Sequence, residues 1–136
     1  VSDSLLAIKP DDVQALVASL TDGYGADVCY DCTGAVPSMQ LGMQLLRKKG
    51  QYVQVGLFSK DIVPVDFSKI IQKELVVSGS RSQNTKDWEP TLGLMSEGRI
   101  AADKMITHEV SIAEWDKAYA LMKDGQATKV VMTPIH

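Results

Sequence analysis

The 136-residue chain is long enough to form a domain with a hydrophobic core. Its composition, 45% hydrophobic and 23% charged, is typical of globular proteins, and a net charge of −3 argues against nucleic acid as a partner. No apolar run approaches the roughly 18 residues of a membrane span, and two cysteines are too few for a disulfide framework. The N-terminal segment lacks the pattern of a signal peptide, so we expect a cytoplasmic protein without membrane contacts.

The order of apolar and polar residues predicts strands separated by amphipathic helices. The predicted helices cover residues 10–23, 36–50, 66–74, 87–98 and 111–125. The predicted strands cover residues 27–34 with the closing turn, 51–56, 62–65, 75–79, 105–107 and 128–134. Strands that alternate with helices of this length favour right-handed βαβ units and a parallel sheet, so we expect an α/β fold.

Several residues mark the ends of the first two predicted helices. Asp11 or Asp12 is expected to cap the first helix, and Gly23 is expected to stop it. The basic run 47–49 is expected in the last turn of the second helix, with Gly50 just past it.

The last predicted helix has the clearest pattern. Ser111 and Glu114 have the spacing of a capping box, and Gly125 closes the helix. Its predicted buried side consists of large apolar residues at helical spacing: Ile112, Trp115, Tyr119 and Met122. Pro90 is predicted in the first turn of the preceding helix, and Pro64 places its short strand at a sheet edge because proline has no N–H for a ladder.

Cys29 and Cys32 have the spacing of a redox or zinc motif, but the pair spans a predicted strand. Side chains three positions apart on a strand point to opposite faces, whereas such a motif needs both sulfurs on one side. No second cysteine pair follows, and His108 and His136 lack the spacing of metal ligands. We therefore interpret Cys29 as a core residue, Cys32 as a residue near the strand end, and His108 as a surface or interface residue.

Three successive predicted strands end in glycine, at Gly34, Gly56 and Gly79. Ligands of open parallel sheets bind beyond the carboxyl ends of the strands, and glycine lets a backbone come close to a ligand. Tight strand-to-loop turns are the alternative explanation for the same glycines, and both explanations stay open at this stage.

A dinucleotide-binding fold carries G-x-G-x-x-G after its first strand and an acidic residue at the end of its second strand. The nearest glycines, in DGYG at 22–25, precede a predicted strand and cannot cradle a pyrophosphate from there. The chain therefore corresponds to the later strands of such a fold. A doubly wound methyltransferase, the alternative with a similar sheet, also requires a glycine-rich loop that the sequence lacks.

The stretch GADVCYDCTGAVPSMQLGMQLLRKKGQYVQVGL resembles the second half of the cofactor domain in the medium-chain, zinc-type alcohol dehydrogenase family. KELVVSGSRSQNTKDW resembles the last strand and exit of that domain, and ITHEVSIAEWDKAYALMKDGQATKVVMTP resembles the C-terminal segment. DCTG and SGSRSQNT are most similar to the sorbitol, polyol and threonine dehydrogenase branch. The resemblance implies a partial doubly wound, Rossmann-type parallel sheet. Residues 1–80 would form the C-terminal half of the dinucleotide-binding domain, and residues 81–136 would return to the catalytic domain.

The resemblance also implies which residues face NAD or NADP. The adenosine half would lie beside Cys32, Thr33 and Gly34. The nicotinamide carboxamide would lie beside the turns after the next two strands, at Val55, Gly56, Leu57, Ser78, Gly79 and Ser80. Two basic residues complete the set: Arg81 near the cofactor and substrate, and Lys129 at the pyrophosphate. Lys129 stands where many relatives have an arginine, so it supplies charge without the bidentate fork. Alternatively, Arg81 and Lys129 are solvated surface charges, and Thr33 caps its turn.

In the family, the zinc ligands, the proton relay, the glycine-rich loop and the ribose-binding acid belong to segments upstream of Val1. The resemblance thus implies an NAD(P)-dependent, zinc-containing dehydrogenase that acts on an alcohol or polyol. We expect no zinc ligand and no catalytic residue in this segment, and an inactive isolated chain. The segment 61–65 resembles the edge strand through which family dimers extend their sheets, so we expect a homo-oligomer, either a dimer or a tetramer.

Two other functions stay open from the residues alone. A free-standing nucleotide-binding or regulatory module would fold by itself and bind NAD(H) or another nucleotide. A structural fragment without a ligand would expose apolar surface and self-associate.

Overall fold

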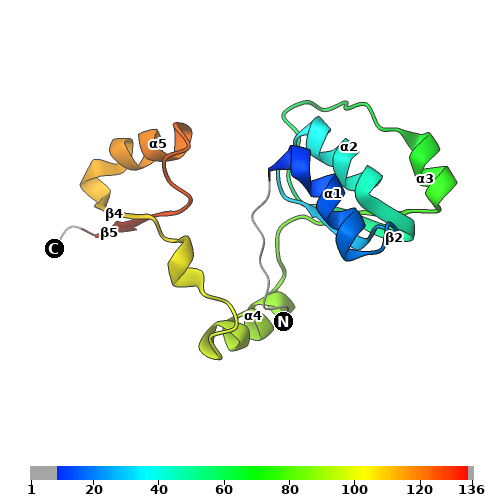
Figure 1. Cartoon of the computed structure of the whole chain (residues 1–136). Helices are drawn as coiled ribbons and strands as arrows, with labels where there is room; N and C mark the ends of the chain where they lie inside the picture. Colours follow the sequence, from blue (N-terminus) through cyan, green and yellow to red (C-terminus); the bar gives the residue numbers. More distant parts are fainter. Residues whose placement is uncertain (1–8, 135–136) are drawn as a thin grey trace. The chain divides into compact units, whose positions relative to one another are not determined.

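The computed structural model describes residues 9–134, and the chain divides into two compact units, residues 1–82 and 83–136 (Figure 1). Helices and strands alternate through the first unit: α1 (Pro10–Leu20), β1 (Ala26–Asp31), α2 (Val36–Leu45), β2 (Leu46–Gln54), α3 (Phe67–Lys73) and β3 (Val76–Gly79). The three strands form a parallel sheet in the order β1-β2-β3. The predicted α/β class with a parallel sheet is therefore confirmed.

The core of the first unit lies where α2 and α3 pack against the sheet. Its buried members come from α2, β2 and the residue before β3: Met39, Met43, Leu46, Tyr52 and Leu75. Ile70 of α3 and Cys29 of β1 pack against this cluster and are partly buried. The expected core position of Cys29 is thus confirmed.

The second unit contains α4 (Thr85–Ser96), the 3₁₀ helix η1 (Ala102–Met105), β4 (His108–Ser111), the 3₁₀ helix η2 (Ile112–Glu114), α5 (Trp115–Lys123) and β5 (Val130–Thr133). β4 and β5 form a two-stranded parallel sheet. Its buried residues are Val110 and Ala118. Among the residues described for both units, no helix has the length and apolar character to cross a membrane.

The end of α2 differs from the prediction. The helix ends at Leu45, and the basic run 47–49 with Gly50 lies in β2 rather than in a helical turn. Leu46 pairs with Ala26 of β1, and the register shifts before the next pair, Val28 with Gln51. Pairing with a strand twenty residues away in sequence overrides the local signal for a helix end.

Two helix starts also differ from the prediction. The residue that caps α1 is Lys9, so Asp11 and Asp12 lie in the first turn. Asn84 caps α4, and the Asp87 side chain completes a capping box there, so α4 begins earlier than expected and Pro90 lies inside it. The predicted stop of α1 is confirmed, because the Gly23 N–H bonds the Ala18 carbonyl at 2.8 Å with a φ of 77°.

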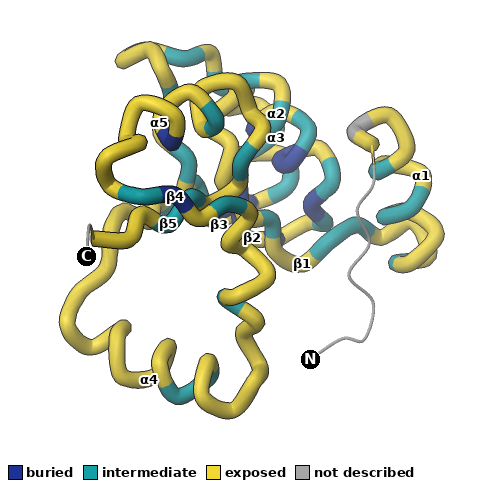
Figure 2. The backbone as a smooth tube through the Cα atoms, turned by 90° about the vertical axis from the view of Figure 1, so that its left-hand side faces the viewer, coloured by how far each residue is buried: buried dark blue, intermediate teal, exposed yellow. Residues whose placement is uncertain are grey.

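The apolar side of α5 is exposed, contrary to the prediction. Ile112, Trp115, Tyr119 and Met122 are between 48% and 67% exposed, and Figure 2 shows the helix largely uncovered. Ala118 is the buried residue of α5, because a small side chain lets the helix lie close to its sheet. Ser111 accepts a hydrogen bond from the Ala113 N–H, but Glu114 makes no reciprocal bond, so the expected capping box is half formed.

Three predicted strands are also corrected. Residues 105–107 precede the strand rather than forming it, so His108, which is half-buried, begins β4. Residues 61–65 form no strand in this structure of a single chain. The strand predicted at residues 75–79 begins one residue later, as β3 at Val76. Val76 and Val77 are 57% and 45% exposed, because β3 lies at the edge of the sheet.

Candidate functional site

The three strands of the first unit end side by side. In the register of the sheet, Asp31 is paired with Gln54, and Gln54 is paired with Gly79. The turns that follow therefore leave the sheet at one edge, which is where open parallel sheets bind ligands. Ten of the eleven residues that the sequence predicts for cofactor binding belong to the ends of these strands or to these turns. The eleventh, Lys129, precedes β5 in the second unit and is exposed.

A cavity of about 270 Å³ opens at this edge between the turns after β2 and β3. Six predicted site residues line it, together with Gln54 and Phe58: Val55, Gly56, Leu57, Gly79, Ser80 and Arg81. A Cβ at Gly79 would meet nothing within 4 Å, so this part of the cavity is open to an incoming group. Because ligand pockets usually have volumes of about 300–1,000 Å³, the cavity suits one part of a larger ligand.

Glycine is required at positions 34 and 56 by the packing of the two turns on each other, not by open space for a ligand. A Cβ at Gly56 would lie 2.7 Å from the backbone carbons of Cys32 and Thr33, and a Cβ at Gly34 would collide with the backbone of Leu57. Gly34 also has a φ of 67°, which disfavours other residues. The packing of one turn on the other therefore explains both glycines without a ligand, whereas Gly79 faces open space.

Asp31 holds the turn after β1. Its side chain is buried, and its Oδ1 accepts hydrogen bonds from the Thr33 N–H and hydroxyl, both at 2.8 Å, and from the Gly34 N–H at 3.2 Å. Burial alone favours the neutral acid, but hydrogen bonds from Thr33, Ser38 and Gly34 outweigh it and lower the pKa of Asp31. Thr33 thus caps the turn by bonding to Asp31, as the alternative to a cofactor contact predicted.

Tyr52 and Gln54 connect this turn to the next one. The Tyr52 hydroxyl lies 3.1 Å from Asp31 Oδ2 and 2.7 Å from Gln54 Oε1, and it shares its one proton between these acceptors. Gln54 Nε2 donates to the Gly56 carbonyl at 2.8 Å. Burial, and then the charge of Asp31, raise the pKa of Tyr52, so the phenol stays a donor.

Sequence reasoning assigned no role to Asp31, Tyr52 or Gln54. A signal for Asp31 existed, because an Asp two residues before a Thr is typical of a turn in which the carboxylate accepts backbone N–H groups. No comparable signal existed for Tyr52 and Gln54. Alternation along β2 places them on one face, but their contacts depend on the pairing with β1.

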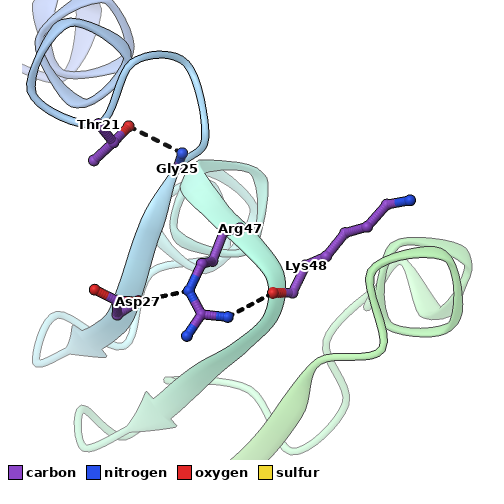
Figure 3. Close-up of polar contacts among 5 residues, drawn as sticks. All are labelled: Thr21, Gly25, Asp27, Arg47 and Lys48. Atoms are coloured by element: carbon purple, nitrogen blue, oxygen red, sulfur yellow. Dashed lines mark hydrogen bonds and ion pairs between the residues drawn. The ribbon is translucent and has the colours of Figure 1, made fainter.

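The opposite end of the sheet has a cavity of about 320 Å³, but two of its basic groups, those of Arg47 and Lys73, are bonded within the protein. Figure 3 shows that the Arg47 guanidinium contacts the Asp27 carboxylate and the Lys48 carbonyl, and that Thr21 accepts the Gly25 N–H at 2.9 Å. This cavity is larger than that at the carboxyl edge, yet its Arg47 is held by protein acceptors. The carboxyl edge is therefore the better candidate site.

The cysteines do not form a metal centre in the described part of the chain. Cys29 and Cys32 are free thiols, the first partly buried and the second exposed. Burial, and then the charge of Asp31, raise the pKa of the Cys29 thiol, which disfavours the thiolate that binds metals. Over residues 9–134, no three His, Cys, Asp or Glu side chains converge to hold a metal ion. These residues do not fit a zinc site.

The first unit is an α/β arrangement with a parallel sheet, and comparison with known sequences shows the family to which the chain belongs. The profile of the zinc-binding dehydrogenase family matches residues 3–97, so the chain belongs to the zinc-binding dehydrogenase family. The predicted resemblance to zinc-type alcohol dehydrogenases is thereby confirmed at the level of the family.

Two curated relatives show where in the family the sequence lies. A sorbitol dehydrogenase from Halalkalibacterium halodurans is 56% identical over 91% of this chain and 36% of its own length. A D-arabitol-phosphate dehydrogenase from Enterococcus avium is 40% identical over 96% of this chain and 37% of its own length. The chain thus spans little more than a third of the relatives it matches, in keeping with the prediction that it corresponds to one portion of such a dehydrogenase.

Solved structures confirm the fold. An alcohol dehydrogenase from Thermotoga maritima matches with a TM-score of 0.84 at 27% identity, over 94% of this chain and 36% of that one. A 2R,3R-butanediol dehydrogenase from Bacillus subtilis matches with a TM-score of 0.79 at 28% identity, over 92% of this chain and 36% of that one. The predicted Rossmann-type arrangement is therefore confirmed.

Proposed function

We propose that this chain is the cofactor-binding portion of an NAD(P)-dependent, zinc-containing dehydrogenase that oxidises an alcohol or polyol. The observation that carries the proposal is the alignment of Asp31, Gln54 and Gly79 at one sheet edge, with an open cavity beyond Gly79. The 56% identity to a sorbitol dehydrogenase supports the substrate class. Relatives named for arabitol phosphate and for erythritol or L-threitol support it further.

The residues of this edge would hold NAD or NADP by their backbones. We assign the turn 32–34 to the adenosine half, and the turn 55–57 with residues 78–80 to the nicotinamide carboxamide. The 270 Å³ cavity lined by the second group has room for one such ring and its amide. When bound, the nicotinamide supplies the hydride acceptor, and these residues orient it.

Two cations are assigned to the polar parts of the cofactor and substrate. Arg81 lines the cavity and is exposed, so its guanidinium is free to reach a bound group. Lys129, also exposed, would place a positive charge on the pyrophosphate. Because an ammonium lacks the fork of an arginine, that contact would be the weaker of the two.

We assign residues 1–80 to the C-terminal half of the dinucleotide-binding domain and residues 81–136 to a segment that returns to the catalytic domain. Because no three His, Cys, Asp or Glu side chains among the described residues converge to hold a metal ion, hydride transfer would require the intact dehydrogenase, and the isolated chain would be inactive. We further propose a cytoplasmic homo-oligomer in which residues 61–65 become a strand by pairing with a second copy.

The test compares the full-length protein that contains this sequence with the 136-residue chain. We expect the full-length protein to reduce NAD⁺ or NADP⁺ with a panel of sugar alcohols that includes sorbitol, arabitol and erythritol, and the isolated chain to be inactive. Turnover by the isolated chain would refute the assignment of catalysis to the rest of the protein. A native product of only 14.8 kDa that binds NADH without turnover would instead identify a free-standing nucleotide-binding module.

A further inference from the structure

Gln54 lies at the centre of the candidate site, bonded directly to the turns after β2 and β3 and connected through Tyr52 and Asp31 to the turn after β1. Its backbone carbonyl accepts the Ser80 N–H at 2.8 Å, which ties it to the turn after β3. Its side-chain Nε2 donates to the Gly56 carbonyl at 2.8 Å, which fixes the turn after β2. Its Oε1 accepts the Tyr52 hydroxyl at 2.7 Å, which leads to Asp31 and the turn after β1.

Asp31 completes the connection from the other side. Its carbonyl oxygen accepts the N–H groups of Val55 and Gly56, both at 2.8 Å, while its carboxylate holds Thr33 and Gly34. The first and second turns are thus joined by both backbone and side-chain bonds. A displacement of either turn would break several of these bonds together.

Two members of this network, Asp31 and Tyr52, are shielded from water. Tyr52 is 1% exposed and Asp31 is 3% exposed, so water does not readily replace a lost partner. Among the described residues, every buried side-chain nitrogen or oxygen has a hydrogen-bond partner. Satisfied buried networks of this kind fix one geometry, because each alternative leaves a polar group unpaired.

We propose that Asp31, Tyr52 and Gln54 act as positioning residues that hold the three turns in the arrangement that binds the dinucleotide. The proposal rests on the proposed function, since it concerns the affinity of that same site. Tyr52 is not one of the residues that line the cavity, and Gln54, which does line it, is bonded to Gly56. The network should therefore affect cofactor binding rather than the chemical step.

The test uses the full-length dehydrogenase and three variants. Tyr52→Phe removes one buried hydroxyl at nearly constant volume, and Gln54→Met removes the amide at similar length. Tyr30→Phe is the matched control, because it removes the same hydroxyl from a tyrosine of β1 that is not part of this network. The dissociation constants for NADH and NADPH are measured by titration, and kcat and KM for the oxidised cofactor are measured by absorbance.

For Tyr52→Phe and Gln54→Met we expect dissociation constants and KM to rise about threefold to tenfold, with kcat within about twofold of wild type. Tyr30→Phe should match wild type. A role in stability alone would lower the melting temperature but leave the dissociation constant of folded protein unchanged, and that outcome for both variants overturns the proposal. If Tyr52→Phe does not fold, Gln54→Met decides, since Gln54 is only half-buried. A wild-type protein that binds neither cofactor refutes the proposed function itself.

Discussion

Replacing Gly56 by alanine tests the packing of the turns most directly. The added methyl group would lie 2.7 Å from two backbone carbons of the turn 32–34 and closer still to the Gly34 nitrogen. Main-chain atoms cannot rotate out of the way as a flexible side chain does, so one turn must shift. Overpacking of this kind costs about 1–3 kcal/mol, and because two turns share the contact we expect about 2–3 kcal/mol.

Gly79→Ala is the matched control for this substitution. It ends the neighbouring strand, but its added methyl would meet no atom within 4 Å, and its φ is not positive. Alanine at such a position restricts the unfolded chain, so we expect no loss of stability and a gain of up to about 1 kcal/mol.

The two variants are compared in the 136-residue chain by urea unfolding. Circular dichroism is the suitable probe, because it follows the helices that cover the sheet. Exchange of the Val55 N–H, which bonds the Asp31 carbonyl, reports opening of the turn itself. If Gly56→Ala unfolds at the same urea concentration as Gly79→Ala, the contact between the turns is not what requires glycine at position 56.

Three further results are expected. Because the folded state lowers the pKa of Asp31, this carboxylate contributes fully to stability at pH values above its ordinary pKa of 3.8. The contribution is lost as the pH falls below 3.8, and urea unfolding of Asp31→Asn should lack this pH dependence. Lys73→Met removes bonds from Nζ to the carbonyls at the end of α2, 2.6 Å for the shortest, and should cost about 1–2 kcal/mol in the same assay, whereas Lys60→Met at an exposed position should cost little. Cys32 should react with a thiol reagent well before Cys29, as mass spectrometry of the labelled peptides would show; equal rates would contradict the burial of Cys29.

The order of helices and strands could be predicted from the sequence because each element carries its own period and end signals. The end of α2 could not, since Arg47 and its neighbours favour a helical last turn as well as a strand. What decides between them is the pairing of Leu46 with Ala26, which is a long-range interaction. Similarly, Asn84 was overlooked as a cap because Pro90 offered an alternative start for the same helix.

Burial was harder to predict than the elements themselves. The spacing of Trp115, Tyr119 and Met122 identifies an apolar helix face, and α5 does have that face. A pattern of this kind indicates that the face favours a partner, but it does not say which element provides one. Within the second unit the sheet contacts Ala118 instead, and the large side chains stay exposed.

That the three strands end at one edge of the sheet could be predicted from the sequence, but the contacts that assemble this edge could not. Glycines at three strand ends indicated the edge, because parallel strands end together. The contact between Asp31 and Tyr52, which helps to hold the edge, joins residues 21 positions apart and depends on strand register. No local pattern encodes that register.

The distribution of aromatic residues gives the two units different optical signatures. Both tryptophans, Trp88 and Trp115, lie in residues 83–136, whereas the aromatic residues of the first unit are tyrosines and phenylalanines: Tyr24, Tyr30, Tyr52, Phe58 and Phe67. Tryptophan emission is therefore a native label for the second unit. Reduced nicotinamide absorbs in the range where tryptophan emits, so NADH that binds close enough to either tryptophan would lower that emission by energy transfer. Tryptophan emission during an NADH titration therefore tests whether the second unit and a bound cofactor come within the range of energy transfer.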